Sequence, residues 1–143
     1  MAAILLAILQ TYKTEHSFNQ EIFMKGTADL ENLNGDFKGF VVGYEGSWQG
    51  KSFNKVEASG INRFKNGEAI IRNYPFKLVA AKGLRDNNLD VIKLDYNQPE
   101  NPWWLRRIVD EVVKTSDNTY LGKFHIRLSQ KFVVSLGYFT LQK

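Results

Sequence analysis

After Gly35, apolar residues recur at every second position in short runs that are separated by turn residues. The runs FKGFVVGY, LDVIKLDY and TYLGKFHIRL show this alternation, which is the side-chain period of a strand with one buried face. Asn-Gly pairs at Asn34-Gly35 and Asn66-Gly67 favour tight turns between such runs. About eight short sequential strands predict a mainly β fold, a small antiparallel up-and-down barrel.

The first 34 residues follow a helical pattern instead. Residues 2–12 are rich in Ala and Leu, and Ser17 has the sequence context of an N-cap for a second helix over residues 18–30. With 143 residues the chain has the length of a single domain. We therefore predict an N-terminal helical segment over residues 1–34 and a barrel over residues 35–143.

The chain begins MAAILLAILQ, and this apolar run needs cover from another surface. It is too short to span a bilayer and lacks the basic flank of a signal peptide, so a cytoplasmic or membrane-peripheral location is expected. Three kinds of cover remain open: the chain's own domain, a protein partner, or the surface of a membrane. An interface through this run would use Leu5, Leu6 and Leu9.

A short inserted helix is predicted after the loop NQPENP, whose two prolines exclude a strand. Asn101 can cap this helix, and Pro102 suits its first turn. The apolar residues from Trp104 to Val112 then fall on one helical stripe. The alternative makes VDEVVKT the first arm of a hairpin that turns at Asp117-Asn118. A short helix near Pro102 that passes directly into a strand satisfies both patterns.

The two adjacent tryptophans are expected to differ in burial. Trp104 heads the apolar stripe and is assigned to the core. Trp103 lies off the stripe, with Arg107 four residues later, so the guanidinium can lie across the indole ring. A partly exposed Trp beside an Arg is typical of interface centres, and Trp103 with Arg107 is therefore predicted to be a protein-binding surface.

The segment YEGSWQGKSF resembles the Gly-x-Trp entry to the first barrel strand of lipocalin-like (calycin) proteins, through Gly46 and Trp48. This likeness implies a barrel that binds a small apolar ligand and has no built-in chemistry. Trp48 is then expected to plug one end of the barrel. The chain departs from a lipocalin because about 45 residues precede the motif.

A wider pattern resembles a bacterial family to which no activity is assigned, over residues 35–143. The matching segments are WQGKSF, GINRF, GLRD, KLDYNQPENPWWLRRIVDE, YLGKF and GYFTLQK. This second likeness carries no expectation about chemistry.

The first functional hypothesis is a non-enzymatic binding protein for a small hydrophobic or amphipathic ligand. Alternation places four aromatic residues on the inner faces of the predicted strands: Phe64, Tyr120, Phe124 and Tyr138. Arg63 or Arg85 at the rim would hold a polar head. Gly122 among these large side chains is expected to leave a slot for the ligand.

No cofactor or metal site is predicted. The chain has no cysteine, which excludes disulfides and thiolate zinc sites. Alternation places His125 on the solvent side of its strand, between Lys123 and Arg127, whose charges disfavour a metal or haem there. Adjacent acids such as Asp110-Glu111 are common on surfaces, so no catalytic pair is indicated and an enzyme is not favoured.

Charge distribution adds two further hypotheses. Residues 51–85 carry eight Lys or Arg against two acids, which indicates either an ordinary solvated face or an acidic partner. Aromatic residues lie among these cations, as in single-strand nucleic-acid grooves, but alternation separates the two kinds onto opposite faces, so nucleic acid is the third choice. The second choice is an assembly subunit of a larger complex that docks through the apolar N-terminus and the Trp103 surface.

Overall fold

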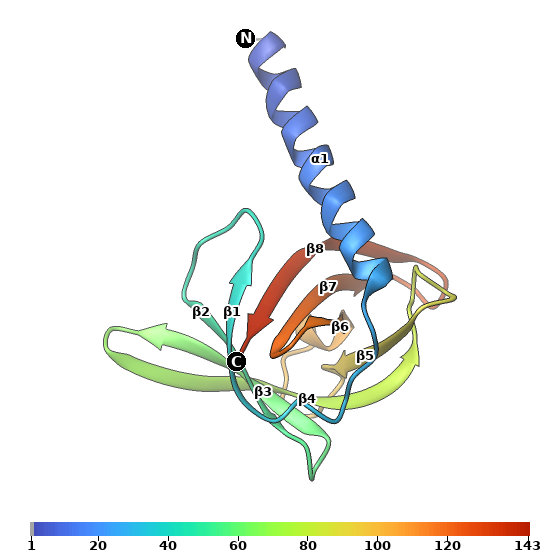
Figure 1. Cartoon of the computed structure of the whole chain (residues 1–143). Coiled ribbons are helices and arrows are strands. Elements are labelled where there is room, and N and C mark those ends of the chain that lie inside the picture. The colour runs from blue at the N-terminus through green and yellow to red at the C-terminus, as the bar shows by residue number, and fades with distance from the viewer. Residues whose placement is uncertain (1) are drawn as a thin grey trace.

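The computed structural model describes residues 2–143, and within its first helix the side chains of residues 3, 4, 6 and 16–25. Eight antiparallel strands follow one another around a closed barrel, and the last strand pairs with the first (Figure 1). The elements are α1 (Ala2–Lys25), β1 (Gly35–Val41), β2 (Trp48–Asn54), β3 (Ser59–Asn66), β4 (Ala69–Lys82), β5 (Asp90–Asp95), the 3₁₀ turn η1 (Leu105–Arg107), β6 (Ile108–Ser116), β7 (Thr119–Arg127) and β8 (Val133–Gln142). The prediction of a mainly β, closed antiparallel barrel is confirmed.

The prediction of two N-terminal helices is wrong, because one helix runs without a break from Ala2 to Lys25. Ser17 lies within this helix, where neither Gly nor Pro interrupts the sequence around it. The helix ends before Gly26, where an added Cβ would lie 2.3 Å from Cγ2 of Val113. Its last turns rest on the barrel near β7 and β8, while its first half projects away from the strands (Figure 1).

The apolar start of α1 is uncovered where its side chains are described. Ile4 and Leu6 are 65% and 66% exposed. The side chains of Leu5 and Leu9, which the sequence also assigns to an interface, lie outside the described residues. No helix in the described part of the chain is both long and apolar enough to cross a bilayer.

One end of the barrel is filled with aromatic side chains and closed by the segment that follows α1. Leu33 of this segment is fully buried and belongs to the main core cluster, together with Phe37, Phe53 and Tyr120. The Tyr120 hydroxyl donates a hydrogen bond of 3.0 Å to the carbonyl oxygen of Asp29 in the same segment. Any open space inside the barrel must therefore lie toward its other end.

Glycines inside the barrel wall make room for large rings. A Cβ added to Gly39 would lie 2.3 Å from the Trp48 ring, and one added to Gly122 would lie 2.1 Å from the Phe139 ring. Such a close approach is open to glycine alone. The slot predicted beside Gly122 is therefore absent, because the Phe139 ring fills that space.

Replacing Gly122 with alanine should lower the free energy of unfolding by about 1–3 kcal/mol, because the added methyl overlaps the Phe139 ring. Urea denaturation measures this loss. Gly46→Ala is the matched control, because the atoms nearest to its methyl belong to the side chain of the exposed Tyr44, which can move aside. Equal stability of the two variants would show that Phe139 is not held against Gly122.

The helix after Pro102 is much shorter than its apolar stripe suggests. Only η1 is helical, and β6 begins directly after it and leads into the turn at Asp117-Asn118. The hairpin alternative is thus correct, together with a short helix near Pro102. Five consecutive residues of β6, from Val109 to Val113, are buried, because both faces of this strand are covered. A strand covered on both sides does not alternate, and its apolar spacing was therefore compatible with a helix.

Strand β8 contains an irregularity that changes which side chains face inward. The register with β7 shifts between Phe124 and His125, which leaves one extra residue at Leu136. The assignment of Tyr138 to the barrel interior is therefore wrong. Tyr138 faces α1, with its ring centroid 6.4 Å from that of Phe23, while Phe139 takes the interior position.

Candidate functional site

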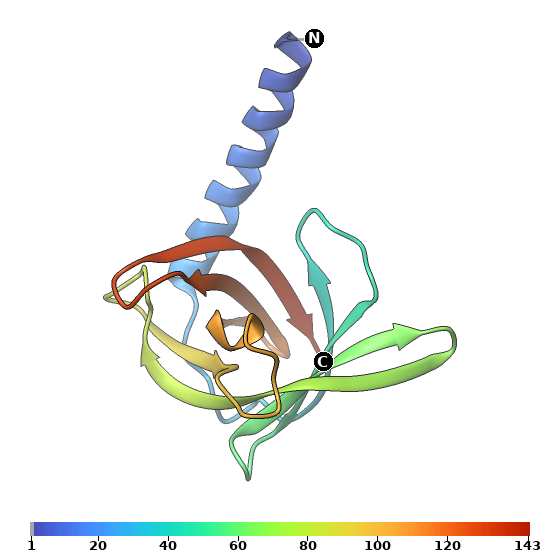
Figure 2. The ribbon, with the colours of Figure 1, turned by 180° about the vertical axis from the view of Figure 1, so that it is seen from behind.

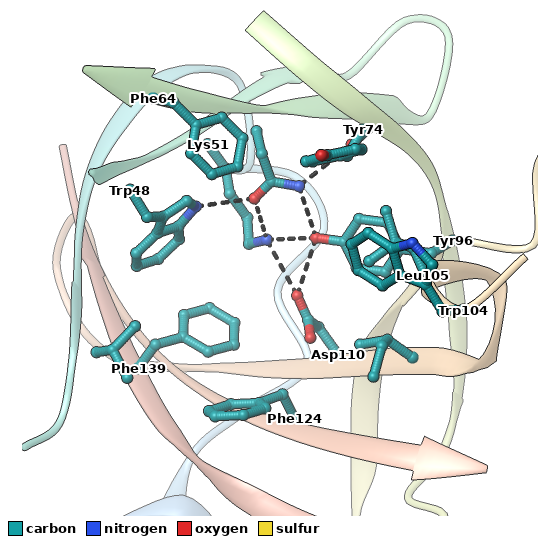
Figure 3. Close-up of a pocket in the computed structure, with 13 residues that line it drawn as sticks. Trp48, Lys51, Phe64, Tyr74, Tyr96, Trp104, Leu105, Asp110, Phe124 and Phe139 are labelled. Atoms are coloured by element: carbon teal, nitrogen blue, oxygen red, sulfur yellow. Dashed lines mark hydrogen bonds and ion pairs between the residues drawn. The ribbon is translucent and has the colours of Figure 1, made fainter. Parts of the chain in front are cut away.

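A cavity of about 310 Å³ occupies the end of the barrel opposite the filled one (Figure 3). The turn η1 lies across this opening (Figure 2). Nine of the lining residues have apolar or aromatic side chains and form the walls: Val41, Trp48, Phe64, Tyr74, Trp104, Leu105, Ile108, Phe124 and Phe139. The other four are Lys51, Asn62, Tyr96 and Asp110, which are all buried and form a polar floor.

Two of the four predicted ligand-lining residues belong to this cavity. Phe64 and Phe124 line its walls. Tyr120 lies in the filled half of the barrel, and Tyr138 lies outside against α1. The cavity is thus assembled from a partly different set of aromatic rings than alternation predicts.

Neither arginine predicted to hold a polar head reaches the cavity. Arg63 lies on the outer side of β3, with its guanidinium 3.9 Å from an Asp36 carboxylate oxygen. Arg85 donates a hydrogen bond of 2.9 Å to the carbonyl oxygen of Val133 on the barrel exterior. The positive charge inside the barrel comes from Lys51 instead.

Lys51 projects into the barrel from β2, and three oxygens surround its ammonium. Nζ lies 2.8 Å from Oδ1 of Asn62, 2.5 Å from the Tyr96 hydroxyl and 3.0 Å from Oδ2 of Asp110. An ammonium has three N–H donors, so each has one acceptor. Four aromatic ring centroids also lie 5.1–5.4 Å from Nζ, and their faces favour a cation.

The side chains of Asn62 and Tyr96 also have a partner for each of their hydrogen-bonding groups. Oδ1 of Asn62 accepts from Trp48 and Lys51, and its Nδ2 donates to the Tyr96 hydroxyl and to the Tyr74 carbonyl oxygen. The Tyr96 hydroxyl accepts from Asn62 and Lys51 and donates to Asp110 over 3.0 Å. All hydrogen-bonding groups of these two side chains are in use.

Asp110 is the one member of the floor with a spare hydrogen-bonding atom. Its Oδ2 accepts from Lys51 and from the Tyr96 hydroxyl. The dashed lines to Asp110 in Figure 3 all end on one carboxylate oxygen. In the part of the chain that the structure describes, Oδ1 accepts no hydrogen bond from the protein. The floor therefore offers the cavity one acceptor.

Burial and the Asp110 charge set the ionisation of the floor. Burial lowers the pKa of the Lys51 ammonium, and the Asp110 carboxylate opposes this shift. Burial and the same carboxylate raise the pKa of Tyr96 well above its usual range, so its hydroxyl stays protonated and can donate. The Lys51 ammonium and the Asp110 carboxylate form an ion pair without net charge at the base of an apolar cavity.

Two β-bulges direct the lining side chains inward. The β2–β3 register shifts between Trp48 and Gly50, so Trp48 and Lys51 both face the interior although they lie three positions apart. In β4, Tyr74 is the extra residue opposite Asn62 and has a positive φ of 64°. Strict alternation places Trp48 and Lys51 on opposite faces, which is why sequence reasoning missed Lys51.

Trp48 forms part of the cavity wall and is not an isolated plug. Its ring packs edge to face on Phe139 at 5.7 Å between centroids, and its Nε1 donates to Asn62 over 2.9 Å. The indole thereby joins the aromatic wall to the polar floor.

The two adjacent tryptophans differ in burial, but the assignment of Trp104 to the core is wrong. Trp104 is 48% exposed and is not a core residue, because it lies at the cavity mouth with its ring 6.1 Å from that of Tyr74. Trp103 is 74% exposed and lines a separate shallow groove with Arg107. Arg107 donates there to the Leu128 carbonyl oxygen over 3.4 Å.

A second buried polar cluster lies outside the barrel wall. His125 is on the outer face of β7, as expected, but it is fully buried, so its assignment to solvent is wrong. Its Nε2 lies 2.8 Å from Oε1 of Glu111, and its Nδ1 lies 2.9 Å from the Ser135 hydroxyl. The backbone N–H of Leu84 donates to the other Glu111 oxygen over 2.7 Å. This cluster fastens the segment after β4 to the barrel wall.

Beside this cluster, Lys123 links α1 to the barrel. Its Nζ lies 2.8 Å from Oε1 of Gln20 and 3.0 Å from Oδ2 of Asp86. The Tyr138 hydroxyl donates to the same Gln20 oxygen. Among the described side chains, no group of three or more His, Asp or Glu residues is placed to hold a metal ion.

Alkaline pH should weaken the contact between α1 and the barrel. Burial, and secondarily the Asp86 charge, raises the pKa of Tyr138 from 10.0 to about 12. Between these values the unfolded chain ionises first and binds fewer protons, so the free energy of unfolding falls as pH rises. Tyr138→Phe should make this fall shallower in urea denaturation across the same pH range. An unchanged slope in the variant would contradict the assignment.

Comparisons with known proteins support the fold alone. No family model and no curated protein matches the chain. A protein from Thermomonospora curvata, known from its crystal structure, has a similar fold with a TM-score of 0.62 and 13% sequence identity. The match covers 87% of this chain and 84% of that protein.

Proposed function

We propose that this chain is a non-enzymatic binding protein whose lipocalin-like barrel takes a small hydrophobic or amphipathic ligand. The observation that carries the proposal is the cavity of about 310 Å³ at one end of the barrel. Ligand pockets typically have volumes of about 300–1,000 Å³, mostly apolar walls and a few placed polar groups. The aromatic walls and the small polar floor match this description.

The filled half of the barrel strengthens the proposal. Phe37, Phe53, Phe76 and Tyr120 pack against one another there. The chain has aromatic side chains of the size needed to fill a barrel, yet the other half remains open. An interior that served only for stability would gain from burying more apolar surface.

The likeness to lipocalins concerns the barrel and the kind of ligand proposed for it. It does not extend to the strand on which the Gly-x-Trp motif lies. Trp48 begins β2, whereas the Gly-x-Trp motif of lipocalins enters the first strand. The chain shares an eight-stranded closed antiparallel barrel with that class. The proposal therefore relies on the cavity more than on the motif.

Binding can be tested with N-phenyl-1-naphthylamine, a neutral probe that fluoresces in apolar surroundings. The protein should bind one probe with saturable fluorescence. Ile108→Phe adds bulk to the cavity wall and should weaken binding at least about tenfold. Val79→Phe adds the same ring to the exposed face of β4 and serves as the control. Absence of binding, or equal binding by the two variants, would refute the proposal.

The exposed apolar residues favour a second candidate, an assembly subunit that binds a protein partner. Ile4 and Leu6 on α1 are exposed, and so is Trp103 at the other surface proposed for docking. Deleting residues 2–9 should then release the partner from complexes isolated by size-exclusion chromatography. An unchanged complex after this deletion, and after Trp103→Ala, would exclude both surfaces.

Nucleic acid remains the third candidate and has the least support. Phe64 lines the cavity, while Arg63 beside it pairs with Asp36 on the outside. Lys51 is buried in the polar floor, and the exposed cations of this region lie on the opposite side of the barrel wall from the Phe64 ring, so a single strand cannot contact both.

A further inference from the structure

The polar floor specifies what kind of group a ligand can place against it. The donors and acceptors of Lys51, Asn62 and Tyr96 are all used within the network. Among the floor atoms, only Oδ1 of Asp110 accepts no hydrogen bond from the described residues, and a carboxylate oxygen can accept but not donate. A ligand that reaches the floor therefore gains a hydrogen bond only if it brings a donor.

We infer that the ligand of this cavity is an uncharged apolar molecule that donates one hydrogen bond, from a hydroxyl or N–H group, to Oδ1 of Asp110. This inference rests on the proposed binding function. Phenols, alcohols and neutral N–H compounds belong to this class, whereas fatty acids and other carboxylates do not. The polar head that the sequence assigns to Arg63 or Arg85 is replaced by a neutral donor that binds Asp110.

The Lys51–Asp110 ion pair disfavours both anionic and cationic ligands. An anion would place a second negative charge beside Asp110, where the N–H and O–H donors of Lys51, Asn62 and Tyr96 are already used within the network. A cation would compete with the Lys51 ammonium, which lies 3.0 Å from Oδ2 of the same carboxylate. A neutral donor avoids both penalties and completes the hydrogen bonding of the floor.

The network also explains why this oxygen is held ready for a ligand. Oδ2 of Asp110 is fixed by two donors, Lys51 and Tyr96, so the plane of the carboxylate cannot turn its other oxygen into the network. Lys51 is fixed in turn by Asn62, which Trp48 holds. Preorganisation of this kind increases affinity because little side-chain entropy is lost on binding.

A matched series of compounds tests the inference by displacement of N-phenyl-1-naphthylamine from the native protein. The series is naphthalene, 2-naphthol, 2-methoxynaphthalene and 2-naphthoate, which share one ring system. We expect 2-naphthol to bind at least about tenfold more tightly than 2-methoxynaphthalene, which lacks the donor, because its hydrogen bond is to a charged acceptor. The 2-naphthoate anion should bind more weakly than naphthalene itself.

Two results would overturn the inference while leaving the binding function intact. One is 2-naphthoate binding as tightly as 2-naphthol, and the other is equal binding of 2-naphthol and 2-methoxynaphthalene. If N-phenyl-1-naphthylamine does not bind in the cavity at all, the proposed function itself fails. One set of titrations thus distinguishes a failure of the donor preference from a failure of ligand binding.

Asp110→Asn provides a second test that keeps the size of the side chain but removes the counter-ion of Lys51, so circular dichroism must first show that the variant is folded. Lys51 and Tyr96 both donate to the atom on the network side, so that atom must be the amide oxygen, and the amide nitrogen must face the cavity. The cavity then offers a donor, and the preference for 2-naphthol over 2-methoxynaphthalene should fall to about one. Asp90→Asn removes an exposed carboxylate of β5 and should leave the preference unchanged. A preference that survives Asp110→Asn would contradict the assignment of Oδ1.

Discussion

Asp110→Ala should lower the free energy of unfolding by about 3–5 kcal/mol, because it leaves the Lys51 ammonium buried without a counter-ion. The Tyr96 hydroxyl also loses its acceptor. A loss of this size is a large part of the stability of a single domain, which is about 5–15 kcal/mol. Urea denaturation of the native chain and the variant measures the difference.

An exposed ion pair provides the control for this experiment. Lys82 and Asp90 lie 2.7 Å apart on the surface, with side chains 60% and 71% exposed. Asp90→Ala should therefore cost less than about 1 kcal/mol. The double variant Lys51→Met/Asp110→Leu removes both buried charges and should recover a large part of the loss. If Asp110→Ala were no worse than Asp90→Ala, the buried pair could not organise the floor.

Glu111→Ala should lower the free energy of unfolding by about 2–5 kcal/mol, since it removes the acceptor from two donors at once. These donors are Nε2 of the buried His125 and the backbone N–H of Leu84. A carboxylate only accepts, so Nε2 carries a hydrogen, and in the neutral ring Nδ1 accepts from the Ser135 hydroxyl. Urea denaturation again gives the size of the loss.

Two variants with smaller expected losses of stability serve as controls for Glu111→Ala. Ser135 is exposed, so water can replace its hydroxyl, and Ser135→Ala should cost less than about 1 kcal/mol. Glu57 is exposed in a turn, and Glu57→Ala should change stability by no more than about 0.5 kcal/mol. Similar losses for Glu111→Ala and Glu57→Ala would show that the outer cluster does not anchor the segment after β4.

The barrel could be predicted from sequence because most of its strands have one buried face. Alternation and Asn-Gly turns located the strands, and they placed Phe64 and Phe124 correctly on the inside. Alternation fails for a strand that is covered on both faces, because both of its faces carry apolar residues. Strand β6 is buried throughout from Val109 to Val113, so its pattern also fits a helix.

The candidate site was harder to predict because bulges change the side-chain period where the site is built. Bulges in β2 and β4 turn Lys51 and Tyr74 toward the cavity, and a bulge in β8 turns Tyr138 out of the barrel. A single added residue reverses the facing of everything beyond it on that strand. The charges themselves were a usable signal, because Asp110 and Glu111 lie in an otherwise apolar segment, IVDEVV.

The central claim, that a ligand occupies the open half of the barrel, can be tested most directly from the three indole N–H signals in a ¹H–¹⁵N NMR spectrum. Trp48 and Trp104 line the cavity, whereas Trp103 lines a separate groove. Single Trp→Phe variants assign the three signals. On addition of 2-naphthol, the Trp48 and Trp104 signals should shift far more than the Trp103 signal. Shifts confined to Trp103, or no shifts at saturating 2-naphthol, would contradict the claim.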